Sequence, residues 1–358
     1  MGKKHYFCPF LSKFISMKKL LFSLSLLAGL VCFQACTTDV NLYADYKDIP
    51  VIYGLIDVSQ DTNFIRINRA FSGNNDHPIN ANEVAMIADS CNYPGKLDAY
   101  IKEYRSGFGN SFDPTGRIIR LDTMTIHDKQ EGIFYSPDQK VYWTNERFNV
   151  NTNGAKYKYK LFVHKGNDTI TSETGVVGGE NFKLLSTSVS FSSEPSDASG
   201  RIKFKLADNA AFYEVKLVFN YKESKNGGPL EYKQVVQNFG MKSVDELLVE
   251  NNTSYVVYAE NSLFIMLEAA IGADTMNVVR YFDEKPVEIM IAAGGDELYN
   301  YVQINSQSGF SQTIPDYTNV NGGYGVFSSR LNLVEDIRIS SRTQTDLYGK
   351  RAWGFMQQ

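Results

Sequence analysis

The stretch VIYGLIDVSQDTNFIRINRAF, residues 51–71, contains two apolar runs separated by a short polar segment. Residues 59–61 (Ser-Gln-Asp) are of types that favour turns. In the second run, residues 63–71, Ile65 and Ile67 alternate with polar and aromatic side chains. Alternation with a period of two on both sides of a turn predicts a β-hairpin with one buried face.

Short runs of the same period continue along the chain, separated by turn residues, which is typical of a sandwich or barrel. These runs are residues 96–105, 117–126, 140–144, 156–164, 168–177, 201–206, 212–221, 230–239, 286–293 and 334–340. We therefore predict a mainly β protein with a domain boundary at Gly178-Gly179. Residues 49–180 are expected to form an immunoglobulin-like β-sandwich. Residues 181–358 are expected to form a β-rich α+β domain.

Two segments of the second half favour helices. SLFIMLEAAI is apolar on all sides and has few β-branched residues, which predicts a buried helix over residues 261–271. In GDELYNYVQIN, Leu298, Tyr301 and Val302 have helical spacing, and two acids stand where a first helical turn would begin. A second helix is therefore predicted over residues 296–305.

The N-terminus has the layout of an export signal. Two lysines precede twelve apolar residues, which is short of the roughly 20 needed to span a bilayer. The sequence Phe-Gln-Ala that leads into Cys36 is similar to a lipobox, the signal for acylation of that cysteine and cleavage before it. We predict that residues 1–35 are removed and that residues 36–48 form a lipidated tether. Met17 begins a complete signal by itself and is an alternative start. The alternative left open is an uncleaved anchor helix.

Cysteine count and charge limit what the mature chain can be. Cleavage would remove two of the four cysteines and acylate Cys36, so Cys91 would remain as a single buried thiol and no disulfide framework is expected. Residues 36–358 contain 31 basic and 40 acidic side chains, a net charge of −9. An acidic chain without a basic run makes nucleic acid a poor partner, and membrane attachment is expected through the N-terminal lipid.

The order of these parts resembles a known family. The hairpin with Val-Ile-Tyr-Gly-Leu (51–55), residues 64–71, and the glycine element TNVNGGYGVF (318–327) are similar to the Bacteroidota envelope lipoprotein family classed as domain of unknown function 4249. The resemblance covers nearly the whole mature chain and carries over no catalytic residue. Members of that family are often encoded beside TonB-dependent receptors, which implies an outer-membrane receptor as a partner.

The motif search gives no candidate catalytic, metal or cofactor site. The sequence has no Gly-x-Ser-x-Gly elbow, no His-Glu-x-x-His helix and no EF-hand loop, and no histidine has a metal-ligand neighbour at suitable spacing. The glycine element lacks the Lys-Ser/Thr of a phosphate-binding loop, so we interpret it as structural. The residues to which we assign this structural role are Asn319, Gly322, Gly323 and Gly325.

Aromatic side chains are the best candidates for ligand or interface residues, because exposed Tyr and Trp bind sugars and anchor interfaces. Tyr142, Trp143 and Trp353 are the first candidates. The alternative is that these are ordinary strand residues.

Three Asp-Thr-aliphatic triplets resemble envelope O-glycosylation acceptors of the same bacterial group. They make Thr123, Thr169 and Thr275 candidate glycosylation sites.

Together these observations predict a lipoprotein without enzymatic activity that works as a binding or accessory component with a TonB-dependent receptor. The alternatives are an envelope glycoside hydrolase and a free-standing carbohydrate- or peptide-binding lipoprotein. The expected location is the outer membrane, with the cell surface favoured over the periplasmic face.

Overall fold

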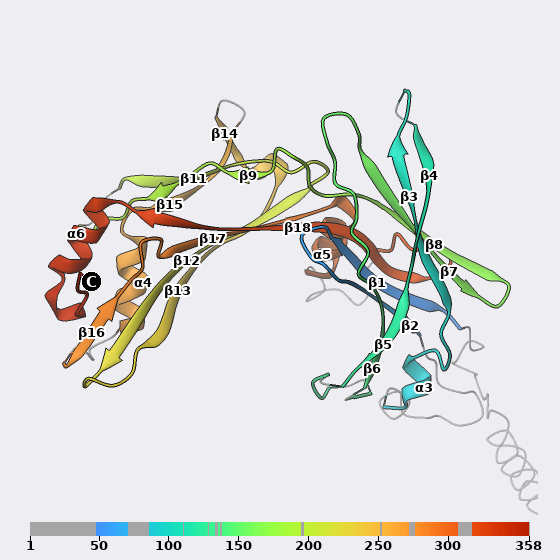
Figure 1. Cartoon of the computed structure of the whole chain (residues 1–358), viewed down its shortest axis with the longest axis horizontal. Coiled ribbons are helices and arrows are strands. Elements are labelled where there is room, and N and C mark those ends of the chain that lie inside the picture. The colour runs from blue at the N-terminus through green and yellow to red at the C-terminus, as the bar shows by residue number, and fades with distance from the viewer. Residues whose placement is uncertain are drawn as a thin grey trace, which may run out of the picture. The chain divides into compact units, whose positions relative to one another are not determined.

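The structure is a computed structural model of the whole chain (Figure 1). It describes residues 48–70, 86–109, 111–127, 129–132, 135–136, 138–194, 197–250, 253–271, 276–306 and 317–357. The predicted signal peptide, Cys36, most of the tether, and Thr275 lie outside these described residues. All of the described residues belong to one compact unit.

The largest sheet has ten strands and runs in the order β13-β12-β17-β18-β1-β2-β6-β5, with β16 paired to β12 and β10 paired to β18. Its strands are β1 (Pro50–Asp57), β2 (Asn63–Arg69), β5 (Asp122–Ile126), β6 (Gln139–Thr144), β10 (Ser188–Val189), β12 (Phe212–Lys225), β13 (Glu231–Ser243), β16 (Val278–Tyr281), β17 (Val287–Gly294) and β18 (Tyr324–Ile339). The hairpin of residues 51–71 is confirmed, because β1 and β2 pair antiparallel.

Two four-stranded sheets pack against this one, and with them the prediction of a mainly β protein is confirmed (Figure 1). One runs β4-β3-β7-β8, from β3 (Asp98–Ser106), β4 (Phe112–Arg120), β7 (Tyr157–Lys165) and β8 (Asp168–Gly175). The other runs β14-β15-β11-β9, from β9 (Lys183–Leu184), β11 (Ser199–Lys205), β14 (Leu248–Glu250) and β15 (Thr253–Ala259).

Four α-helices are present in the described residues: α3 (Ala88–Cys91), α4 (Ser262–Ile271), α5 (Asp296–Ser306) and α6 (Ser341–Gly349). Two 3₁₀ turns, η1 (Val244–Glu246) and η2 (Arg351–Trp353), complete the elements. The two helices predicted from sequence correspond to α4 and α5 and are confirmed, whereas α6 was not predicted. No helix in the described ranges is long and apolar enough to cross a bilayer.

The buried apolar side chains form two clusters. One cluster draws on residues 52–176 together with Val320 and Phe327, and the other on residues 177–355. Strand β18 contributes to both, because its first half pairs with β1 and its second half with β17. The immunoglobulin-like assignment and the boundary near residue 180 stay predictions.

Candidate functional site

The most promising site starts from the strand alternation of β1 and β2. Ile52 and Ile65 point into the core and are at most 2% exposed. Their neighbours Tyr53 and Phe64 point to the other face, where they are 38% and 46% exposed. Val326 of β18 pairs with Tyr53 in the parallel ladder and so lies on this second face.

Helix α5 lies along this face of the sheet. Leu298, Tyr301 and Val302 project from it at helical spacing and line the same hollow as Tyr53. The rings of Tyr301 and Tyr53 meet edge to face, with centroids 5.9 Å apart and planes at 70°. Burial, and then a hydrogen bond with Tyr53, raise the pKa of Tyr301 to about 12, so the Tyr301 hydroxyl is neutral at physiological pH.

A buried carboxylate fixes the polar end of the hollow. Asp57, at the end of β1, is 3% exposed. Its Oδ2 accepts hydrogen bonds from Arg330 Nε at 3.0 Å and Asn332 Nδ2 at 2.9 Å, and its Oδ1 accepts from the Ser59 amide at 3.0 Å. These bonds join the hairpin turn to β18 and leave the exposed guanidinium of Arg330 at the rim.

The result is a groove of about 410 Å³ that we name the aromatic groove. It is lined by Tyr53, Gly54, Leu55, Asp57, Gln60, Thr62, Asn63, Phe64, Leu298, Tyr301, Val302, Val326 and Arg330. Its volume lies within the range of ligand pockets, roughly 300–1,000 Å³, and an apolar wall with a few polar groups at one end is the usual lining of such pockets. The arrangement suits a ring or apolar side chain that carries polar substituents.

A second hollow contains acidic groups at the start of α5. Glu297 accepts hydrogen bonds from Thr174 Oγ1 at 3.0 Å and Ser328 Oγ at 2.9 Å. Burial raises the pKa of the Glu297 carboxyl, and the neighbouring Asp296 adds to the rise. Glu173 also lines this hollow. The volume of the hollow is about 190 Å³, which is below the usual size of a ligand pocket.

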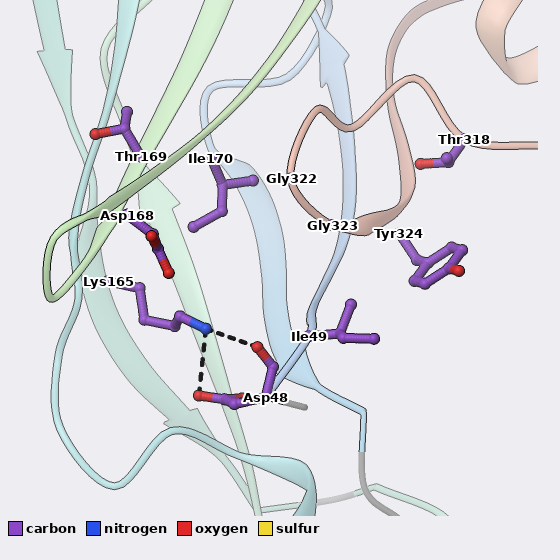
Figure 2. A pocket seen from close by; sticks show the side chains of 10 residues that line it. All are labelled: Asp48, Ile49, Lys165, Asp168, Thr169, Ile170, Thr318, Gly322, Gly323 and Tyr324. Atoms are coloured by element: carbon purple, nitrogen blue, oxygen red, sulfur yellow. Dashed lines mark hydrogen bonds and ion pairs between the residues drawn. The ribbon is translucent and has the colours of Figure 1, made fainter. Parts of the chain in front are cut away.

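A third hollow, of about 650 Å³, lies beside the glycine element (Figure 2). Lys165 donates a hydrogen bond to the carbonyl of Asp48 at 2.6 Å and pairs with the carboxylate of that residue at 3.5 Å. Asp48 is the residue at which the described chain begins, so Lys165 ties the end of the predicted tether to β7. Gly322 and Gly323 stand on the opposite side.

The residues of the glycine element have backbone roles. Gly322 adopts a φ of +85°. A Cβ on Gly323 would lie 2.6 Å from the carbonyl oxygen of Pro50. Asn319 ties the loop to β18, because its Nδ2 donates to the Phe327 carbonyl at 2.7 Å and its Oδ1 accepts from the Phe327 amide at 3.0 Å. Gly325 is the most restricted of these glycines, because a Cβ there would lie 1.9 Å from the carbonyl oxygen of Ile52.

The three aromatic residues singled out by sequence are not brought together. Tyr142 is fully buried, and its hydroxyl accepts a hydrogen bond from the Leu97 amide at 2.9 Å, so its side chain is a core residue and offers no surface to a ligand. Trp143 is half-buried and pairs with Phe64 across β2 and β6. Trp353 is half-buried and stacks on Phe264 with centroids 5.9 Å apart.

Sequence reasoning missed the residues of the aromatic groove as a set. Two local patterns nevertheless marked its members, one in the hairpin and one in the helix. Alternation in the hairpin places Tyr53 and Phe64 on one face, and helical spacing marks Tyr301. Their meeting depends on the packing of α5 on the sheet, which neither pattern contains.

The candidate glycosylation sites within the described residues lie on different sheets. Thr123 is half-buried on β5. Thr169 is exposed on β8, and its Oγ1 lies 3.0 Å from Nδ1 of His164. Over the described ranges, no group of three His, Cys, Asp or Glu side chains is placed to hold a metal ion.

A scan of the chain against protein-family models found no match, and a search of curated proteins found no relative.

Proposed function

We propose that this protein is a lipid-anchored outer-membrane protein that works by binding, with the aromatic groove as its binding site. The groove is the observation that carries the proposal, since it holds exposed Tyr and Phe side chains in a hollow large enough for a ligand. The lipobox-like sequence before Cys36 supports the anchor.

The proposed partner is a TonB-dependent receptor of the outer membrane. The resemblance to the lipoprotein family supports this partner, and an acyl anchor would confine both proteins to one membrane. Confinement raises their effective concentration, so a modest interface suffices to keep them associated. We place the protein on the cell surface in preference to the periplasmic face, with an immunoglobulin-like sandwich as its N-terminal part.

Two alternatives make different use of the same chain. A free-standing carbohydrate- or peptide-binding lipoprotein would use the aromatic groove without a receptor. A glycoside hydrolase would need an acid with a raised pKa, and Glu297 is such an acid. The hollow beside Glu297 is too small for a sugar chain, and two hydroxyl groups already donate hydrogen bonds to Oε2 of this carboxylate. The binding function is therefore the better supported.

The partner proposal predicts that affinity purification from gently solubilised envelopes recovers a receptor with the wild type. The double variant Tyr53→Ala/Phe64→Ala should recover at least about tenfold less receptor. The reason is that loss of a central aromatic residue from an interface typically costs about 2 kcal/mol or more of binding free energy. The matched control is Tyr232→Ala, which removes a tyrosine that is 80% exposed on β13. Recovery of no receptor by the wild type would defeat the partner claim. Equal recovery by the double variant would show that the receptor does not bind at the aromatic groove.

The anchor has its own prediction. Radiolabelled palmitate should enter the wild type and be absent from Cys36→Ala, because the thiol of this cysteine is the proposed acylation site. Equal labelling of the two would contradict the assignment.

Protease shaving of intact cells tests the membrane face: digestion places the protein on the surface, whereas resistance that lysis abolishes places it on the periplasmic face.

A further inference from the structure

The outer face of the sheet β14-β15-β11-β9 carries a concentrated positive charge. Arg201, Lys203 and Lys205 alternate along β11 with Ile202 and Phe204. The two apolar residues are fully buried in the core, so the three basic side chains project outward, where all are exposed. Successive members of this row stand about 6.6 Å apart along the strand.

The neighbouring strands extend this surface. Lys183 of β9 stands directly opposite Lys205, and Tyr255 of β15 stands opposite Lys203. Leu248 and Val257 flank Tyr255 and are 50% and 40% exposed. We name these residues the basic face: Lys183, Arg201, Lys203, Lys205, Leu248, Tyr255 and Val257.

The charges of its three lysines are not balanced by an acidic partner among the described residues. Within the described part of the chain, Lys183, Lys203 and Lys205 form no ion pair, whereas Arg201 pairs with Glu250 and stacks over Tyr255 at 4.6 Å. Like charges directly opposite each other destabilise a sheet. The repulsion between Lys183 and Lys205 therefore destabilises the sheet, and a bound anion would relieve that repulsion.

A second group of lysines shows the contrast. On the sheet β4-β3-β7-β8, the Lys102 Nζ lies 4.9 Å from the centre of the Phe162 ring and the Lys158 Nζ lies 4.7 Å from that of Phe112. Lys160 lies 3.8 Å from the carboxylate of Glu173. These lysines have partners within the protein and are only half-exposed, so they are less available to an outside anion.

We infer that the basic face rests on an anionic lipid surface as a second contact beside the acyl anchor. The inference rests on the proposed anchor, which would hold the chain at a bilayer. A mature chain of net charge −9 is repelled by an anionic surface in most orientations. When the basic face is turned toward the surface, its lysines make the interaction attractive. Exposed basic, aromatic and aliphatic side chains on one face are the combination that binds anionic lipid headgroups, and such a face adds to the membrane affinity that an acyl anchor provides.

The test uses the acylated mature protein in vesicles of phosphatidylcholine alone or of phosphatidylcholine with phosphatidylglycerol. A water-soluble acetylating reagent reports the accessibility of each lysine by mass spectrometry. Acetylation of Lys183, Lys203 and Lys205 should be about fivefold slower or more on the anionic vesicles, the factor expected for about 1 kcal/mol per basic contact. High salt should abolish the difference.

Variants make the test specific. Lys203→Glu should remove the protection of Lys183 and Lys205, whereas the control Lys156→Glu, at an exposed lysine outside the basic face, should leave it intact. Equal acetylation on both vesicle types would overturn the inference, as would protection of Lys102 and its neighbours in place of the basic face. Loss of the protein from the vesicles would defeat the lipid anchor and the inference together, whereas retention with equal acetylation would defeat the inference alone.

Discussion

Replacing Gly325 by alanine should lower the free energy of unfolding by about 3–5 kcal/mol, at the upper end of single-residue effects. Gly325 pairs with Ile52 where β18 meets β1. Its φ is +108°, a conformation that side chains rarely adopt, and a Cβ there would lie 1.9 Å from the carbonyl oxygen of Ile52. Because the three nearest atoms all belong to the backbone of Ile52, the strands must separate to admit the methyl group.

Denaturant unfolding of the two proteins measures this loss. The control is Gly95→Ala, because Gly95 has an ordinary φ and open space around its Cβ position. This control should remain within about 0.5 kcal/mol of the wild type. A Gly325→Ala protein within the same range would show that the parallel pairing does not depend on this residue.

The contrast between β1–β2 and β1–β18 shows what the sequence could predict. The hairpin is visible because alternation and turn residues stand within one short stretch. The parallel pairing joins Val51 to Tyr324 across most of the chain, and nothing local in either strand names its partner. The glycine element did mark the place, since a glycine that no side chain can replace indicates a close backbone approach.

Two other differences have similar causes. Residues 117–126 were predicted as one strand, but the chain changes sheets at Leu121, so β4 and β5 pair with different partners. Helix α6 was missed because the alternating run of β18 leads directly into it. Its start does carry a local signal, because the Ser340 side chain accepts a hydrogen bond from the Thr343 amide as an N-cap.

The candidate site was less predictable than the fold. Tyr142 and Tyr53 are both strand tyrosines, and the sequence does not distinguish them. One is buried by the facing sheet and the other is exposed beside α5. Composition therefore indicated the kind of side chain that a binding site would use, and tertiary packing decided which of them are available.

A buried ion pair near the C-terminus gives the second large prediction. Arg280 on β16 is 1% exposed. Its Nε and Nη2 donate to Oε2 of Glu223 at 2.8 and 2.6 Å, and its Nη1 donates to the Trp353 carbonyl at 2.6 Å. The variant Glu223→Met leaves this guanidinium buried without its carboxylate, and removal of one partner from such a pair costs about 3–5 kcal/mol.

The double variant Glu223→Met/Arg280→Met separates the cost of the orphaned charge from the worth of the pair. It should recover much of the loss, because two apolar side chains leave no buried charge, although the Trp353 carbonyl loses a donor. The matched surface pair is Lys233 and Glu231, 2.7 Å apart on β13 with both side chains more than 40% exposed, and Glu231→Met should change stability by less than about 1 kcal/mol. If Glu223→Met were no worse than Glu231→Met, the buried pair would not anchor the C-terminal segment to β12 and β16. If the double variant were as unstable as the single one, the loss would come from packing, because an orphaned charge would then explain none of it.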